Sequence, residues 1–137
     1  MKKYCLYLIL HCLLCMLNFQ AYAQASDRNI LFIHSYSENT NGHDRLEDGL
    51  RRGLSDLAIS ANIFTEHLNS ESLFFAEECE AMRAICQRAR ENNVELIVTV
   101  SDEAFYTLMN CGDSLGYHLP VVVSAIKFPP TDLLTMN

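Results

Sequence analysis

Hydrophobic and polar positions follow two alternating periods along the chain. Three mainly apolar runs, Ile30–His34, Leu96–Val100 and Val121–Ile126, have the length and composition of strands covered on both faces of a sheet. Ser60–His67 instead alternates residue by residue between apolar and polar side chains. This pattern predicts a half-polar strand that suits the edge of a sheet.

Helical spacing fills the segments between these strands. Thr40–Leu57 carries leucines every three or four residues, and Thr40 or Asn41 can cap the helix. Gly49 and Gly53 lie near its apolar stripe and predict a close approach of helix to sheet. The stripe consists of Leu46, Leu50, Leu54 and Leu57.

Two further helices are predicted. Ser72–Asn92 has acidic residues early and arginines late, which complements the helix dipole. A short helix follows Leu96–Val100, with Ser101 as its cap and Gly112 near its end. The apolar stripe of the longer helix consists of Phe75, Cys79, Met82, Cys86 and Ala89.

The resulting order, β-α-β-α-β-α-β, predicts an α/β fold with a three-layer parallel sheet. Right-handed crossovers and the polar second strand favour the strand order 2-1-3-4, as in flavodoxin-like folds. The last strand, Val121–Ile126, then lies at the open edge although it is apolar, whereas natural edges are usually charged or short. We therefore expect more chain, a second copy or a partner segment to cover it, and we expect the fold to be incomplete.

The amino-terminal residues have the three parts of a cleaved export signal. Lys2 and Lys3 precede the apolar run Leu6–Leu17, and Ala21-Tyr22-Ala23 fits a small-x-small cleavage site. The alternatives are an uncleaved anchor and a lipid anchor, and Leu14 before Cys15 disfavours the lipid anchor. Cleavage after Ala23 predicts a periplasmic protein with a single domain over residues 24–137.

The net charge of the chain after cleavage limits the classes of binding partner that we expect. Removing Lys2 and Lys3 from the 10 basic residues leaves 8 against 17 acidic ones, a net charge of −9. Such a surface repels nucleic acid and offers no basic face to anionic lipid. We expect neither DNA binding nor membrane association after cleavage.

Three cysteines remain after the predicted cleavage: Cys79, Cys86 and Cys111. An odd number argues against a disulfide framework. Cys79 and Cys86 stand roughly 10 Å apart along one helix, beyond disulfide reach, and are predicted to be small buried side chains. A bridge from Cys111 to either one stays open, and no spacing indicates a metal site.

Candidate binding residues gather where the parallel strands end, because their carboxyl ends meet at one rim. They are His34, Ser35, Tyr36, Ser101, Asp102 and Ser124. Hydroxyls, an imidazole and a carboxylate suit hydrogen bonding to a small polar solute. Capping is the better explanation for Ser101. At His34–Tyr36 no cap is needed, and ligand binding and a purely structural role explain these residues equally.

Three more specific functions fit the sequence less well. A hydrolase would need Ser35 and His34 together, but neighbouring side chains in a strand point to opposite faces, and no G-x-S-x-G elbow is present. A flavodoxin would hold phosphate in the hydroxyl-rich turn from Ser35 to Gly42. A phosphoacceptor receiver could use Asp102 and Ser124, but it lacks the acidic pair after the first strand.

Four motifs resemble a known family: ILFIHSYS, GLRRGL, TVSDEAF and PVVVSAIKFP. Together they span about residues 29–130 and are similar to the first lobe of periplasmic-binding-protein-like domains of the ABC-transporter solute-binding type. The closest similarity is to the extracytoplasmic sensor of bacterial two-component, often hybrid, histidine kinases. The resemblance implies half of a type I periplasmic-binding fold, with the six rim residues lining one side of a ligand cleft.

The chain departs from this family in two respects. It has no Trp after the first strand, and it lacks the second lobe and the membrane, kinase or transporter-docking parts. We expect a non-enzymatic solute-binding or sensory lobe without cofactor or metal. A small flavodoxin-like cofactor protein and a remnant that pairs with a separate second lobe are the alternatives.

Overall fold

A computed structural model describes residues 27–38, 44–113 and 115–128 of the chain. The predicted export signal, Met1–Ala23, and the predicted helix caps Thr40 and Asn41 lie outside the described residues.

Four parallel strands form the centre of the molecule in the order β2-β1-β3-β4, which confirms the predicted α/β fold and strand order. Their bounds are Arg28–His34 (β1), Ala61–His67 (β2), Leu96–Val100 (β3) and Val121–Ser124 (β4). The last strand ends at Ser124 and not at the predicted Ile126. Ala125 has a φ of 54°, a left-handed conformation that stops an extended strand.

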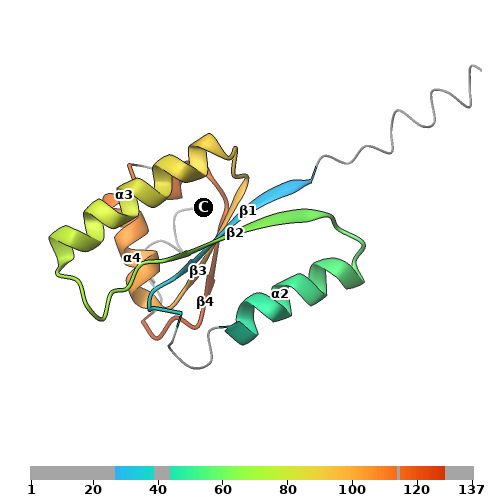
Figure 1. The fold of residues 1–137 in the computed structure, drawn as a ribbon, viewed down its shortest axis with the longest axis horizontal. Coiled ribbons are helices and arrows are strands. Elements are labelled where there is room, and N and C mark those ends of the chain that lie inside the picture. The colour runs from blue at the N-terminus through green and yellow to red at the C-terminus, as the bar shows by residue number, and fades with distance from the viewer. Residues whose placement is uncertain (1–26, 39–43, 114, 129–137) are drawn as a thin grey trace, which may run out of the picture.

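Helices cover both faces of this sheet, giving three layers (Figure 1). One face carries α2, Asp44–Asp56, and the other carries α3, Phe75–Glu91, with α4, Asp102–Cys111. A four-residue helix, α5, Leu115–His118, was not predicted and connects α4 to β4.

Strand periodicity divides the core into two clusters. Ile30, Phe32, Val98 and Val100 face α2, and Leu31, Ile33 and Ile97 face α3 and α4. β1 and β3 are the inner strands, so both of their faces are buried, as their continuous apolar runs predicted. The edge strand β2 divides its residues in the predicted way, with Ile63 toward α2 and Phe64 toward α3.

Most of the predicted apolar stripe of α3 is correct. Cys79, Met82, Cys86 and Ala89 are buried. Phe75 is 63 % exposed, because the helix begins at this residue and not at Ser72. The Glu77 carboxylate accepts the backbone N–H of Phe74 at 2.8 Å, which satisfies one of the free amides at the helix start.

The glycines of α2 do not have the predicted role, because Gly49 and Gly53 are both exposed. Outside the neighbouring backbone of the helix itself, no atom lies within 4 Å of the position that a β-carbon on either glycine would occupy. Leu57 is 71 % exposed, and the leucines that pack against the sheet are Leu50 and Leu54. Cavities of about 320 and 330 Å³ lie beside Leu54, between the end of α2 and the sheet.

A disulfide joins Cys79 of α3 to Cys111 at the end of α4, with Cα atoms 5.1 Å apart. The prediction of Cys79 as a simple buried hydrophobe is therefore wrong. Sequence spacing excluded a bond within one helix but could not show which helices are neighbours. Cys86 stays free and buried, and this burial raises the pKa of its thiol to about 11.

The core packing gives a first prediction. Met82 is fully buried between α3 and the sheet, so Met82→Ala should lower the free energy of unfolding by about 2–5 kcal/mol through the cavity it leaves. Leu57→Ala removes a similar side chain from an exposed position and should change stability by less than about 0.5 kcal/mol. Urea unfolding of both variants tests this, and equal losses would contradict the assigned core.

The disulfide gives a second prediction. Closing a loop between residues 32 positions apart stabilises a protein by about 2–4 kcal/mol, so a reducing agent should lower the unfolding free energy by that amount. The double variant Cys79→Ala/Cys111→Ala should be insensitive to the same reducing agent. If the reductant destabilises this variant equally, the bond does not form between these two cysteines.

Candidate functional site

The carboxyl ends of the strands bring the six predicted residues to one rim. His34, Val100 and Ser124 are register partners across β1, β3 and β4, so their side chains share the α2 face. The ladder continues past the strands, because the Ser35 N–H donates to the Val100 carbonyl at 3.2 Å. The Ser101 N–H donates to the Ser124 carbonyl at 2.9 Å.

Ser35 has a structural task at this rim. Its fully buried hydroxyl donates to the Val100 carbonyl at 2.7 Å and accepts the Ala104 N–H at 2.8 Å. The bond to Ala104 is the one that an N-cap side chain normally makes to the third residue of a helix. Ser35 therefore caps α4 from another strand, and the expectation that no cap is needed at His34–Tyr36 is wrong.

Ser101 does not act as the predicted cap. It precedes α4, but its φ is 74° and its side chain makes no capping hydrogen bond. A capping serine normally has extended backbone angles with negative φ, which place the hydroxyl over the first turn. Ser101 has a positive φ instead, so its hydroxyl does not cap the helix. The Ala104 N–H donates to the Ser35 hydroxyl in its place.

Asp102 holds the segment that follows β4. Its carboxylate accepts the backbone N–H of Lys127 at 3.1 Å and that of Phe128 at 3.0 Å. Asp102 is also the first residue of α4, where a negative charge is favoured by the helix dipole. Its carboxylate thus joins α4 to the edge of the sheet.

Tyr36 and Glu103 are joined by a side-chain hydrogen bond at the rim. The Tyr36 hydroxyl donates to Glu103 Oε1 at 2.8 Å. This bond to a carboxylate, with some burial, raises the pKa of Tyr36 to about 12, so the phenol stays protonated. Glu103 Oε2 and the hydroxyl of Ser70 are buried and have no hydrogen-bond partner among the described residues.

Neither Glu103 nor Ser70 was among the predicted site residues. Glu103 was attributed to the first turn of its helix, and Ser70 lies in the connection after β2. The hydrogen bond from the Ser70 N–H to the Ser35 carbonyl, at 2.8 Å, brings this connection to the rim. The position of Glu103 directly after Asp102 was the available signal, because Glu103 lies only three positions after the end of a buried strand.

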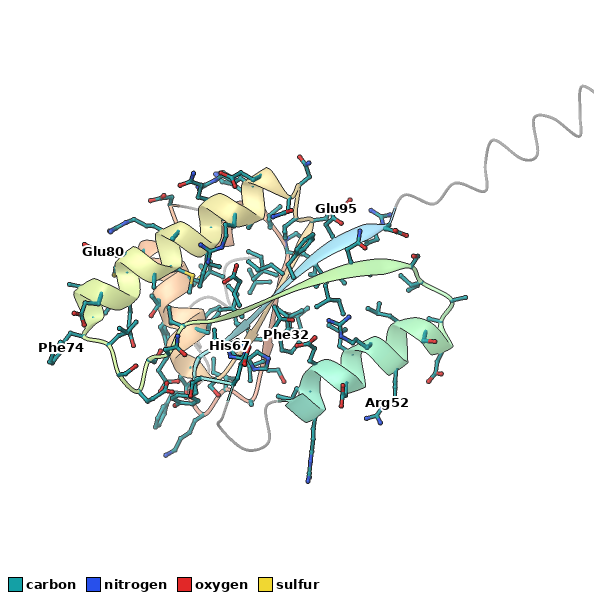
Figure 2. The ribbon with its side chains drawn as sticks, in the orientation of Figure 1. Phe32, Arg52, His67, Phe74, Glu80 and Glu95 are labelled. Atoms are coloured by element: carbon teal, nitrogen blue, oxygen red, sulfur yellow. A yellow bond between two sulfur atoms is a disulfide. The ribbon has the colours of Figure 1, made fainter. Side chains whose placement is uncertain are left out.

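A polar cluster lies on the α2 side of the same strand ends. His34, only 1 % exposed, stacks on His67 of β2, a residue that was also not predicted, with ring centroids 4.8 Å apart. Glu47 of α2 places Oε2 at 3.8 Å from His34 Nε2 and accepts the Thr65 hydroxyl at 2.9 Å. Figure 2 shows His67 and Phe32 between the sheet and α2.

Neighbouring side chains stabilise the negative charge of Glu47. Its burial would raise the pKa of the carboxyl, but hydrogen bonds from Arg51 and Thr65 outweigh this and hold the pKa below its usual value. The carboxylate therefore stays ionised at neutral pH and joins α2 to β2 and to its own next turn.

Two exposed aromatic side chains belong to segments that follow strands of the sheet. Phe74, 82 % exposed, precedes α3 and projects away from the ribbon in Figure 2. Phe128 follows β4 and is 64 % exposed, with Lys127 Nζ at 5.3 Å from its ring centroid. These two side chains add exposed apolar surface to a molecule whose rim carries carboxylates and hydroxyls.

Among the described residues, no group of three or more His, Cys, Asp or Glu side chains could hold a metal ion. Within the same part of the chain, no helix is both long and apolar enough to cross a membrane. Comparison with known proteins found no matching family model, no matching curated protein and no matching solved structure.

The capping arrangement gives a third prediction. Ser35→Ala leaves the Ala104 amide without its buried acceptor and should lower the unfolding free energy by about 1–3 kcal/mol. Ser101→Ala removes a hydroxyl that makes no capping bond and should change it by less than about 0.5 kcal/mol. Urea unfolding distinguishes the two, and a larger loss for Ser101→Ala would restore the conventional cap.

Proposed function

We propose that the chain is an exported, non-enzymatic lobe that binds or senses a small polar solute at the carboxyl rim of its sheet. The observation that carries this proposal is the presence of Tyr36, Glu103 and Ser70 at this rim. Two of their oxygens, Glu103 Oε2 and the Ser70 hydroxyl, are buried without a partner among the described residues. Such oxygens are costly unless something hydrogen-bonds to them.

The chemistry of these groups suggests a ligand that donates hydrogen bonds. Glu103 offers a carboxylate oxygen, and Ser70 can both accept and donate. The neighbouring carboxylates of Asp102 and Glu71 accept backbone N–H groups and keep the rim acidic. A solute with amine, amide or hydroxyl donors suits this surface better than an anion.

The proposal includes the resemblance to a periplasmic-binding-protein-like first lobe, as in solute-binding proteins or the sensors of histidine kinases. A rim at the strand ends is where open α/β sheets bind ligands. The exposed side chains of Phe74 and Phe128 offer apolar surface on which a second lobe could close over the solute. The predicted export signal supports a periplasmic location for this activity.

Two other classes have less support. In a flavodoxin-like cofactor protein the turn after β1 would bind phosphate through its amides, but the Ser37 N–H donates to the Glu71 carboxylate at 3.0 Å. In a hydrolase, Ser35 would be the nucleophile, but its hydroxyl is buried between Val100 and Ala104. One observation supports a remnant that pairs with a separate partner: Val122 on the edge strand β4 is 50 % exposed, so a partner segment could cover it.

A solute panel tests the proposal. Thermal-shift and calorimetric titrations with amines, amino acids and sugars should find at least one solute that binds the purified protein. Tyr36→Phe, which removes one hydroxyl, and Glu103→Gln should weaken that binding by about 10-fold or more, because each hydrogen bond to a charged group contributes about 1.5–3 kcal/mol.

The matched control is Glu80→Gln, which removes an exposed carboxylate on α3 away from the rim. It should leave the affinity unchanged. Equal affinity in all three variants would place the binding elsewhere, and the absence of binding with flavin absorbance in the purified protein would favour the cofactor alternative.

A further inference from the structure

The stacked imidazoles of His34 and His67 form an unusual junction. The two residues are register partners on neighbouring strands, and their rings are 7° from parallel with centroids 4.8 Å apart. The ring of Phe32 packs on His34 with a centroid distance of 4.8 Å. Since His34 is almost fully buried, its imidazole has little access to water.

The hydrogen bond of His67 fixes its tautomer. His67 Nδ1 lies 2.9 Å from the backbone carbonyl of Tyr36. A carbonyl oxygen can only accept, so Nδ1 must carry the proton in the neutral ring. The unprotonated Nε2 then faces outward, 3.9 Å from Glu38 Oε1.

Charged groups surround the pair from each element that packs against it. From α2, Glu47 approaches His34, and Arg51 binds the same carboxylate. From the segments after β1 and β2, Glu38 and Glu71 approach His67. Two positively charged rings stacked at this centroid distance would repel each other.

We propose that the His34–His67 stack is a proton-operated latch that holds α2 and the Tyr36 segment to the sheet. With at most one proton taken up, the stack joins β1, β2, the Tyr36 carbonyl and, through Glu47, the first half of α2. A second proton places two positive charges in the stack and drives the rings apart.

The consequence is large because α2 has few other attachments. Gly49 and Gly53 are exposed and contribute no side chain, so Glu47, Leu50 and Leu54 provide much of the contact between α2 and the sheet. Acidification should therefore loosen α2 and the segment that carries Tyr36, while α4, held by Ser35 and the disulfide, stays in place. The latch does not require that the rim binds a solute, so the two proposals can fail separately.

Amide hydrogen exchange at pH 7.5 and pH 5.0, corrected for the intrinsic rates, tests the latch. In the unaltered protein, protection of the α2 amides should fall by about 10-fold or more at pH 5.0, and that of α4 by less than about 2-fold. His67→Gln keeps a donor for the Tyr36 carbonyl but cannot be charged, and it should abolish the pH dependence of α2. His118→Gln, at an exposed position in α5, should behave like the unaltered protein.

Equal α2 protection at both pH values, or the same loss in His67→Gln, would overturn the latch. A second measurement on the unaltered protein does not depend on the folding of any variant. Nitrogen NMR of the imidazoles at pH 8 should find the His67 proton on Nδ1, whereas a proton on Nε2 would remove the bond to Tyr36 and the proposal with it.

Discussion

The rim of this molecule depends on one buried hydroxyl, that of Ser35. It donates to the Val100 carbonyl where β3 ends and accepts the Ala104 amide where α4 begins. Because one side chain makes both bonds, the end of β1, the end of β3 and the first turn of α4 are fixed together. This arrangement also sets the position of Glu103 in the first turn of α4, where its carboxylate accepts the Tyr36 hydroxyl.

The two faces of the sheet are held in different ways. Toward α3 and α4, the disulfide of Cys79 and Cys111 closes a core that includes Met82 and Leu108. Toward α2, the contact relies on two leucines and on the polar group around Glu47. Hydrophobic burial is insensitive to pH, whereas a group built from histidines and carboxylates responds to it. A change of shape with pH should therefore begin on the α2 face.

Most of the fold could be predicted from the sequence, because apolar periodicity and strand order depend on local pattern and on general rules of chain connection. β3 was predicted to the residue, and the alternation of β2 correctly placed it at an edge. The end of β4 was missed because a left-handed residue, Ala125, leaves no trace in the apolar pattern. The role of Gly49 and Gly53 was mispredicted because glycines near an apolar stripe permit a close approach of helix to sheet without requiring one, and both are exposed.

The candidate site was predictable only as a location. The rim follows from parallel strands, and its residues from the β1, β3 and β4 ends were found. Their partners were not: Ala104 lies 69 residues from Ser35, and Glu103 lies 67 from Tyr36. His67 meets His34 only through strand register. Such pairings depend on tertiary contacts that no local spacing encodes. They give Ser35 and Asp102 structural roles, and Tyr36 is a residue that we propose for ligand binding.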